Sequence, residues 1–394
     1  MKKTKLIKYI LLLLISTGIS NAQTFKDVIK GITENNKSIK AYTEYLNGVH
    51  LDAKVNTFLP NPKAEYSYMS GSNSGIGSKK EFSISQTFEF PSVYYLKSGL
   101  SDIQKKINQN LENAFTREVI LNSGHVLIDY IYQSKLVDEL TKRVAYADTI
   151  YKAVEKKYNL GEAGILELNK SKSALNLAKS KLNIAKTEII SLKSSLENLN
   201  GGNKLNLTGI DYWLPGFITN FDSLFTILKG ADYSLKSLQE EKQLSLQKLS
   251  IAKSGWLPGF DIGYIQEDDE NNFNFKGARI GLSIPLFENS NKVPKAESEL
   301  NLYELNIQNY LTEFQIKKRN LYDKSFQLNS ALQEQKSLMD FGQLELNRKS
   351  FELGHISLTQ YYIDNSMYFD IIDSMLEIEK EYYKVSFELI IEII

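Results

Sequence analysis

The sequence predicts an α+β membrane protein in which a β-barrel, built from four strands per chain, is continued by a long α-helical coiled-coil barrel. Three observations predict this fold class: apolar residues recur at heptad spacing through long segments, two shorter regions alternate apolar and polar residues, and the whole arrangement occurs twice. The Leu59-Pro60 and Leu160-Gly161 pairs recur as Leu257-Pro258 and Leu353-Gly354, roughly 195 residues later in both cases. We therefore expect an internal tandem repeat.

The repeat divides the chain into segments of one plan, in which each unit runs helix, two strands, very long helix, tight turn and helix. Residues 1–22 have several lysines, then an apolar run at 10–15, then Ser20-Asn21-Ala22, which is typical of a signal peptide cleaved after Ala22. We expect the first repeat at 23–200, a linker at 201–220 and the second repeat at 221–394.

Composition limits the classes of partner. The chain has 47 basic and 47 acidic residues, and removal of the four leader lysines leaves a net charge of −4, which disfavours a nucleic-acid partner. Cysteine is absent, so disulfides and lipid attached to cysteine are excluded. No run after the leader approaches the roughly 20 apolar residues of a transmembrane helix. Contact with a membrane is therefore expected from a barrel or a partner.

The strands are expected at about 62–90 and about 259–286. In the first pair Phe82, Ile84 and Phe88 alternate with serine and threonine, and in the second Ile280 and Leu282 alternate with glycine and serine. An ordinary two-stranded ribbon is the alternative, but an isolated hairpin is only marginally stable in water and no other segment supplies partner strands. Four strands do not close a barrel, so a dimer with eight strands and a trimer with twelve both remain open.

The long helical arms are expected at 91–161 and 285–354, each about 100 Å long. The shorter helices at 25–58 and 165–199 are each about 35 residues long, so that end to end they equal one arm. Heptad seams along these helices are interpreted as packing surfaces. The seam of the second arm contains Ala296, Leu300, Tyr303, Ile307, Tyr310, Phe314, Leu321, Leu328, Ala331 and Leu338.

This order of motifs resembles the TolC-like outer-membrane efflux protein family over nearly the whole mature chain. The resemblance rests on the duplicated unit, the Leu-Pro entry to each strand pair, the proline at each exit and the Tyr/Phe-x-x-Gly turn. It implies a homotrimer with a twelve-stranded barrel in the bacterial outer membrane and a large periplasmic helical tunnel. The segments 59–62 and 85–91 are similar to the heavy-metal cation efflux subgroup. Multidrug members and members linked to type I secretion share the same architecture.

The resemblance also implies which residues act at the periplasmic end. The two turns would dock onto a periplasmic adaptor, or membrane fusion, protein that connects the channel to an inner-membrane pump such as an RND or ABC transporter. The residues that match these turns are Tyr158, Asn159, Leu160 and Gly161, and Phe351, Glu352, Leu353 and Gly354.

Acidic residues after the second turn form a pore gate in many family members. Here the six-residue offset from the glycine holds Gln360, and the nearest acid is Asp364, which departs from the family pattern. Glu167, at the same offset from the first turn, is the alternative acid, although a solvated helix face also explains it. Tyr361 and Tyr362 are candidates to narrow the passage by their bulk.

No catalytic motif is present, so we expect no enzyme and no cofactor or resident metal. The three histidines lie far apart, and the H-E-x-x-H, P-loop and G-x-S-x-G patterns are absent. The resemblance thus implies a passive exit duct, with energy supplied by the partner pump. A secreted coiled-coil scaffold is the competing class; it explains the heptads but neither the alternating strands nor the duplicated turns.

Overall fold

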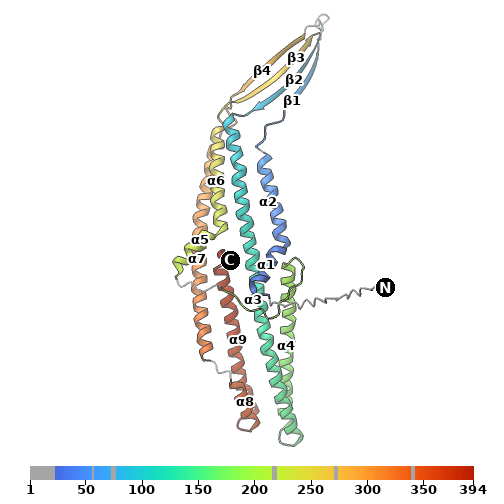
Figure 1. The fold of residues 1–394 in the computed structure, drawn as a ribbon, viewed down its shortest axis with the longest axis vertical. Coiled ribbons are helices and arrows are strands. Elements are labelled where there is room, and N and C mark those ends of the chain that lie inside the picture. Colours follow the sequence, from blue (N-terminus) through green and yellow to red (C-terminus); the bar gives the residue numbers. More distant parts are fainter. Residues whose placement is uncertain (1–22, 56, 72–76, 215–219, 270–273, 339–341) are drawn as a thin grey trace, which may run out of the picture.

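The computed structural model shows an elongated molecule with a β-sheet at one end and helices along the rest of its length (Figure 1). The connections between α3 and α4 and between α8 and α9 lie at the end opposite the sheet. The predicted signal peptide lies outside the described residues. The structure describes residues 23–394 except 56, 72–76, 215–219, 270–273 and 339–341.

The sheet is a four-stranded antiparallel meander in the order β1-β2-β3-β4. Its strands are β1 (Lys63–Ser70), β2 (Ser78–Phe88), β3 (Gly259–Asp269) and β4 (Asn274–Ser283). The pairing of β2 with β3 joins segments that are far apart in the sequence, since Ile84 lies opposite Tyr264. The expectation of four strands per chain, in a chain that is otherwise mainly helical, is confirmed.

One face of this sheet, the apolar face, is dominated by large apolar side chains that have no cover. Ile280 is 81 % exposed and Tyr66 is 66 % exposed. Side chains of this size seldom gather on a water-exposed surface, so the face requires lipid or a partner. The cross-strand register places on it Ala64, Tyr66, Tyr68, Phe82, Ile84, Phe88, Phe260, Ile262, Tyr264, Ile280 and Leu282.

The opposite face, the polar face, is lined mainly by small and charged residues. Glu65 on β1 and Arg279 on β4 attract each other electrostatically although two strands lie between them. The polar face includes Lys63, Glu65, Ser67, Met69, Lys79, Glu81, Ser83, Ser85, Thr87, Asp261, Gly263, Ile265, Glu267, Phe275, Gly277, Arg279, Gly281 and Ser283.

The helices form two sets that follow the order expected from the sequence. The first set is α1 (Phe25–Asn35), α2 (Lys37–Val55), α3 (Pro91–Asn159) and α4 (Ile165–Leu199). The second set is α5 (Phe221–Ala231), α6 (Tyr233–Ser254), α7 (Lys292–Leu338), α8 (Gln343–Glu352) and α9 (Leu358–Leu389), followed by a short 3-10 helix, η1 (Ile391–Ile393). Among the described helices, none is both long enough and apolar enough to span a bilayer.

Helix α3 is an uninterrupted helix of 69 residues along which α1, α2, α4, α6 and α9 pack. Pro91 stands in its first turn, where the missing backbone N–H costs nothing and the ring fixes a helical φ. The helix therefore begins directly at the end of the sheet and runs to the far end of the molecule (Figure 1).

The helix predicted at 25–58 is divided in two, as is the helix segment that precedes β3, whereas the helix predicted at 165–199 is continuous as α4. Asn36 separates α1 from α2, and Asp232 separates α5 from α6; both residues have extended backbone with ψ of 121° and 117°. The Asn36 side chain accepts hydrogen bonds from two backbone N–H groups of α2, and Asp232 accepts one from Leu235. Both residues are thus N-caps, which start a new helix in the middle of an apolar pattern.

The second arm is shorter at its start than the sequence predicted. Helix α7 begins at Lys292, and residues 285–291 form turns in its place. Asn291 has a φ of 67°, a left-handed conformation that an α-helix does not contain. Residues 339–341 lie outside the described part, so the continuity of α7 with α8 is not described.

The largest hydrophobic cluster lies near the middle of the helical part and includes residues of the expected linker. Leu205 and Leu207 are buried there against α1, α3 and the end of α9. This packing attaches the connection between the halves to the helices. The buried members are Phe25, Val28, Ile29, Ile32, Leu127, Ile128, Ile131, Leu196, Leu205, Leu207, Phe387 and Ile391.

Candidate functional site

The first predicted turn reverses the chain at the end of α3. Leu160 follows the last helical residue, and Gly161 has a φ of 77°. The N–H of Glu162 donates to the carbonyl of Lys157 at 2.8 Å, which closes the turn over the helix end. This is the Schellman arrangement, in which glycine takes the left-handed position at little steric cost.

The second predicted turn has the same geometry at the end of α8. Gly354 again has a φ of 77°, and the N–H of His355 donates to the carbonyl of Ser350 at 2.9 Å. Ser357 then caps α9 by accepting a hydrogen bond from the N–H of Gln360. The two turns, 158–161 and 351–354, therefore present equivalent backbone surfaces at the end of the molecule farthest from the sheet (Figure 1).

A leucine projects from each turn at the same position before the glycine. Leu160 is 63 % exposed and Leu353 is 72 % exposed. Asn159 and Glu352, which precede them, are exposed as well. An apolar side chain at the tip of a polar helical hairpin is a natural anchor for another protein, because burying a leucine is worth about 2 kcal/mol.

The aromatic residues that begin the two motifs have different environments. Tyr158 is 38 % exposed, whereas Phe351 is 5 % exposed. The Phe351 ring lies against the ring of Tyr361, with centroids 5.6 Å apart. Phe351 therefore supports the second turn from inside, and the tyrosine of the first turn is partly available at the surface.

Two of the candidate gate residues form a pair on the first turns of α9. The Gln360 side-chain amide donates to Oδ1 of Asp364 at 2.6 Å, and the bond is exposed to solvent. Glu167 is exposed in the first turn of α4. The structure thus places all three polar candidates on the surface close to the two turns.

The two tyrosines that were candidates to narrow the passage differ in burial. Tyr361 is 3 % exposed and packs with Ile150, Val154, Phe351 and Leu358 inside one chain. Tyr362 is half-buried beside this cluster, and Lys170 lies 6.0 Å from its ring centroid. Burial raises the pKa of each phenol to about 12, so both remain neutral at physiological pH. In this chain Tyr361 holds α9 against α3, and Tyr362 is the tyrosine closer to the surface.

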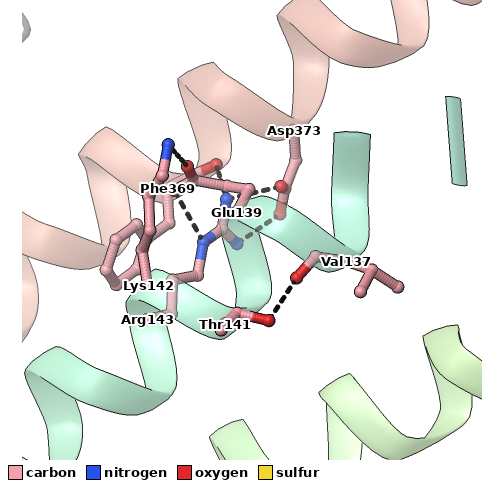
Figure 2. A network of polar contacts seen from close by, with 7 residues as sticks. All are labelled: Val137, Glu139, Thr141, Lys142, Arg143, Phe369 and Asp373. Carbon is pink, nitrogen blue, oxygen red and sulfur yellow. Dashed lines mark hydrogen bonds and ion pairs between the residues drawn. The ribbon is translucent and has the colours of Figure 1, made fainter. Parts of the chain in front are cut away.

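Helices α3 and α9 are also joined by a charged contact that the sequence did not reveal (Figure 2). The Arg143 guanidinium donates to the two carboxylate oxygens of Asp373 at 2.9 Å and 2.6 Å. It also lies 4.4 Å from the Phe369 ring centroid and 3.3 Å from Oε1 of Glu139. The arginine side chain is 8 % exposed, whereas that of Asp373 is 44 % exposed. The contact links the two helices above the turns.

No group of side chains suited to hold a metal ion is found in the part of the chain that the structure describes. Its histidine, aspartate and glutamate side chains nowhere form a group of three that could hold a metal ion. What this end of the molecule offers is a pair of matched, apolar-tipped turns with polar residues behind them.

An exposed apolar sheet at one end, long packed helices and matched turns at the other are also the fold of solved bacterial outer-membrane proteins. VceC, an outer membrane protein of Vibrio cholerae, superposes with a TM-score of 0.75 at 10 % identity, covering 93 % of this chain and 95 % of VceC. The CmeC outer membrane channel of Campylobacter jejuni gives 0.70 at 15 % identity, covering 93 % and 85 %. CusC gives 0.68 at 13 % identity, covering 93 % and 91 %.

The four-stranded sheet joined to long helices, expected from the resemblance to the TolC-like family, is therefore confirmed for one chain. The trimer and the closed barrel stay predictions. The sequence itself matches no protein-family model and no curated protein. The structural similarity extends over nearly the whole chain, but sequence identities of 10 to 15 % establish the fold alone.

Proposed function

We propose that three copies of this chain form a channel across the bacterial outer membrane. The observation that carries the proposal is the sheet: its apolar face is exposed, and within the described strands β1 and β4 each lack a second partner. An unpaired edge is not tolerated in lipid, so the sheet must close with strands from other chains. Three copies would give a barrel of twelve strands, with the apolar faces toward lipid and the polar faces around the lumen.

The helices would continue the barrel as a tube through a large periplasmic portion. Exposed apolar side chains outside the sheet, such as Leu302, Leu305 and Phe326 on α7, would then be covered by neighbouring chains. Their burial would stabilise the homotrimer in the same way as the seams within one chain.

The turns at 158–161 and 351–354 would dock a periplasmic adaptor protein. Leu160 and Leu353 are the residues expected to anchor it, because both are exposed at equivalent places on equivalent turns. The inner-membrane pump beyond the adaptor, of the RND or ABC type, would supply the energy. The chain itself would act as a passive exit duct and not as an enzyme.

The gate is expected beside the turns. Asp364, held by Gln360, and Glu167 are the acids that would face ions near the tube end, and Tyr362 would add bulk. Replacement of Asp364 or Glu167 by alanine should change single-channel conductance or cation preference. An unchanged current in both variants would remove these acids from the gate.

The first test is the assembly. Protein extracted from the outer membrane should run as a heat-modifiable, detergent-stable trimer and should form conducting channels in planar bilayers. A soluble, elongated dimer without channel activity would instead support the secreted coiled-coil scaffold.

The docking test uses the turns. The double variant Leu160→Ser and Leu353→Ser should keep the trimer and its conductance but lose cross-linking to the adaptor and complementation of a deletion strain. Lys152→Ser is the surface control on the same helix, because that side chain is 69 % exposed and lies before the turn. Equal cross-linking in the double variant and in the control would contradict the docking role.

The transported substrate is proposed from the sequence resemblance to heavy-metal cation efflux, with multidrug efflux and type I secretion as alternatives. Growth of a deletion strain on metal salts, detergents and drugs separates these cases. Selective sensitivity to metals would support cation efflux, and sensitivity to detergents and drugs alone would support the multidrug assignment.

A further inference from the structure

Arg279 occupies an unusual place on the polar face of the sheet. It lies on β4 directly opposite Gly263 of β3, and Gly277 and Gly281 flank it two residues away on the same face of β4. These three neighbours lack a side chain, whereas Ile265 lies opposite Gly277 and Asp261 lies opposite Gly281 on the same face of β3. Arg279 is thus flanked by glycines along β4 and has the acid Asp261 diagonally across from it on β3.

The absence of side chains around Arg279 is enforced by close contacts. A Cβ atom on Gly263 would lie 2.7 Å from the carbonyl oxygen of Ile84, and one on Gly281 would lie 3.2 Å from Cβ of Asp261. A Cβ atom does not come within 2.7 Å of a carbonyl oxygen in real proteins, so Gly263 cannot be replaced without a shift of the backbone. Of the positions directly beside Arg279, Gly263 is therefore restricted to glycine and Gly281 is closely packed against Asp261.

The described residues give Arg279 no hydrogen bond and no ion pair, in contrast to the other basic residues of this face. Lys63 pairs with Glu65, and Lys79 pairs with Glu267 at 2.8 Å. The interaction of Arg279 with Glu65 across the sheet is a longer-range electrostatic attraction. The charge of Arg279 is thus not cancelled by a contact partner, and arginine stays protonated at every accessible pH.

The acids of the polar face have a different distribution along the strands. Glu81 and Glu267 lie at the end of the sheet far from the helices, where Lys79 is the basic residue among them. Nearer the helices, Lys63 and Arg279 lie on the same face as Glu65 and Asp261, so the described charges of this half balance. Arg279 therefore offsets negative charge that a cation would otherwise meet in this half of the lumen wall.

We propose that Arg279 sets the ion selectivity of the duct. This inference rests on the proposed function, because it needs three polar faces closed around one lumen. Three guanidinium groups then offset the carboxylates of Asp261 and lower the passage of small cations in the half of the barrel nearer the helices.

The effect is electrostatic and must depend on salt. The Debye length is about 10 Å at 0.1 M and about 3 Å at 1 M ionic strength. An arginine on the wall of a wide lumen therefore acts on passing ions at low salt and is screened at high salt. We expect the ratio of cation to anion permeability to rise about twofold or more at 0.1 M when the charge is removed, and to change little at 1 M.

The experiment measures reversal potentials of single channels in a potassium chloride gradient. Arg279→Gln should shift the reversal potential toward cation selectivity, and Arg279→Lys should restore the wild-type value. Lys276→Gln is the matched control, because Lys276 lies on the same strand with its side chain on the opposite face. Arg279→Ala is a second neutral variant for use should the glutamine variant fail to assemble.

The outcomes separate the inference from the proposed function. Channels with unchanged selectivity in Arg279→Gln and Arg279→Ala would overturn the role of Arg279 and leave the channel itself intact. An equal shift in Lys276→Gln would also overturn it, because the effect would then come from net charge and not from the lumen wall. Wild-type protein that forms no channels would overturn the proposed function, and with it this inference.

Discussion

The contact between Arg143 and Asp373 predicts an unequal response when either partner is removed. The arginine side chain is 8 % exposed and that of the aspartate 44 % exposed. Loss of the carboxylate leaves the guanidinium with Glu139 at 3.3 Å and with the Phe369 ring, whereas loss of the arginine removes every contact at once. Arg143→Ala should therefore cost more than Asp373→Asn.

The magnitudes follow from the contacts. Asp373→Asn removes two hydrogen bonds between charged groups. Because the carboxylate is partly exposed and Glu139 remains beside the guanidinium, the expected loss of stability is about 1 kcal/mol. Arg143→Ala also loses the contact with the Phe369 ring and the packing of its stem, for a total of about 2 to 3 kcal/mol. Both variants are expected to loosen α9 locally and to leave the trimer intact.

Amide hydrogen exchange of peptides from α9 measures this local opening directly. Exchange should become about fivefold faster in Asp373→Asn and about 30- to 150-fold faster in Arg143→Ala, since exchange reports the free energy of opening. Asp148→Asn is the control: it breaks an exposed pair with Lys152 on α3 and should leave α9 unchanged. Equal acceleration in the two test variants, or none in either, would refute the reasoning.

Three further predictions concern single positions. Gly354→Ala should weaken the second turn by about 1 kcal/mol, because φ is 77°, and exchange at the turn should accelerate while Gly354→Asn has a smaller effect. Asp232→Ala should lower the thermal unfolding temperature by removing an N-cap and the acceptor of the Tyr310 hydroxyl, worth about 2 kcal/mol together, whereas Asp232→Asn should keep the cap. Burial raises the pKa of Glu392 above its ordinary 4.5 despite the ion pair with Lys318. The protonated side chain therefore stabilises the fold fully below pH 4.5, and this contribution is lost as the pH rises through the raised pKa. Thermal unfolding should therefore show that the stability of wild type relative to Glu392→Gln falls as the pH rises above 4.5; a constant difference would contradict the assignment.

Much of the fold was predictable because its signals are local and repeated. Alternation around Phe82 and Ile280 indicated both strands and their apolar face, and the motifs ending in Gly161 and Gly354 indicated the turns, whose left-handed glycines are a local requirement. The repeat predicted one strand pair in each half, but it did not predict that β2 of the first pair lies beside β3 of the second.

The features that the sequence did not predict depend on distant partners or on ambiguous residues. Asn36 and Asp232 end helices within apolar patterns, where a polar residue could equally belong to a solvated face. Arg143 and Asp373 are separated by 230 residues, so no local pattern connects them. Asp364 and Glu167 stay predictions as gate residues, because their role depends on a lumen that one chain does not enclose.

The open edges of the sheet also bear on inheritance. If three chains share one barrel, a chain that folds but cannot pair its β1 or β4 edge with a neighbouring chain inactivates the whole trimer, including the two normal chains. At equal expression and random mixing, about one-eighth of the trimers would contain only normal chains. Edge-strand variants should therefore be genetically dominant, whereas variants that prevent folding, and so never enter an assembly, should be recessive.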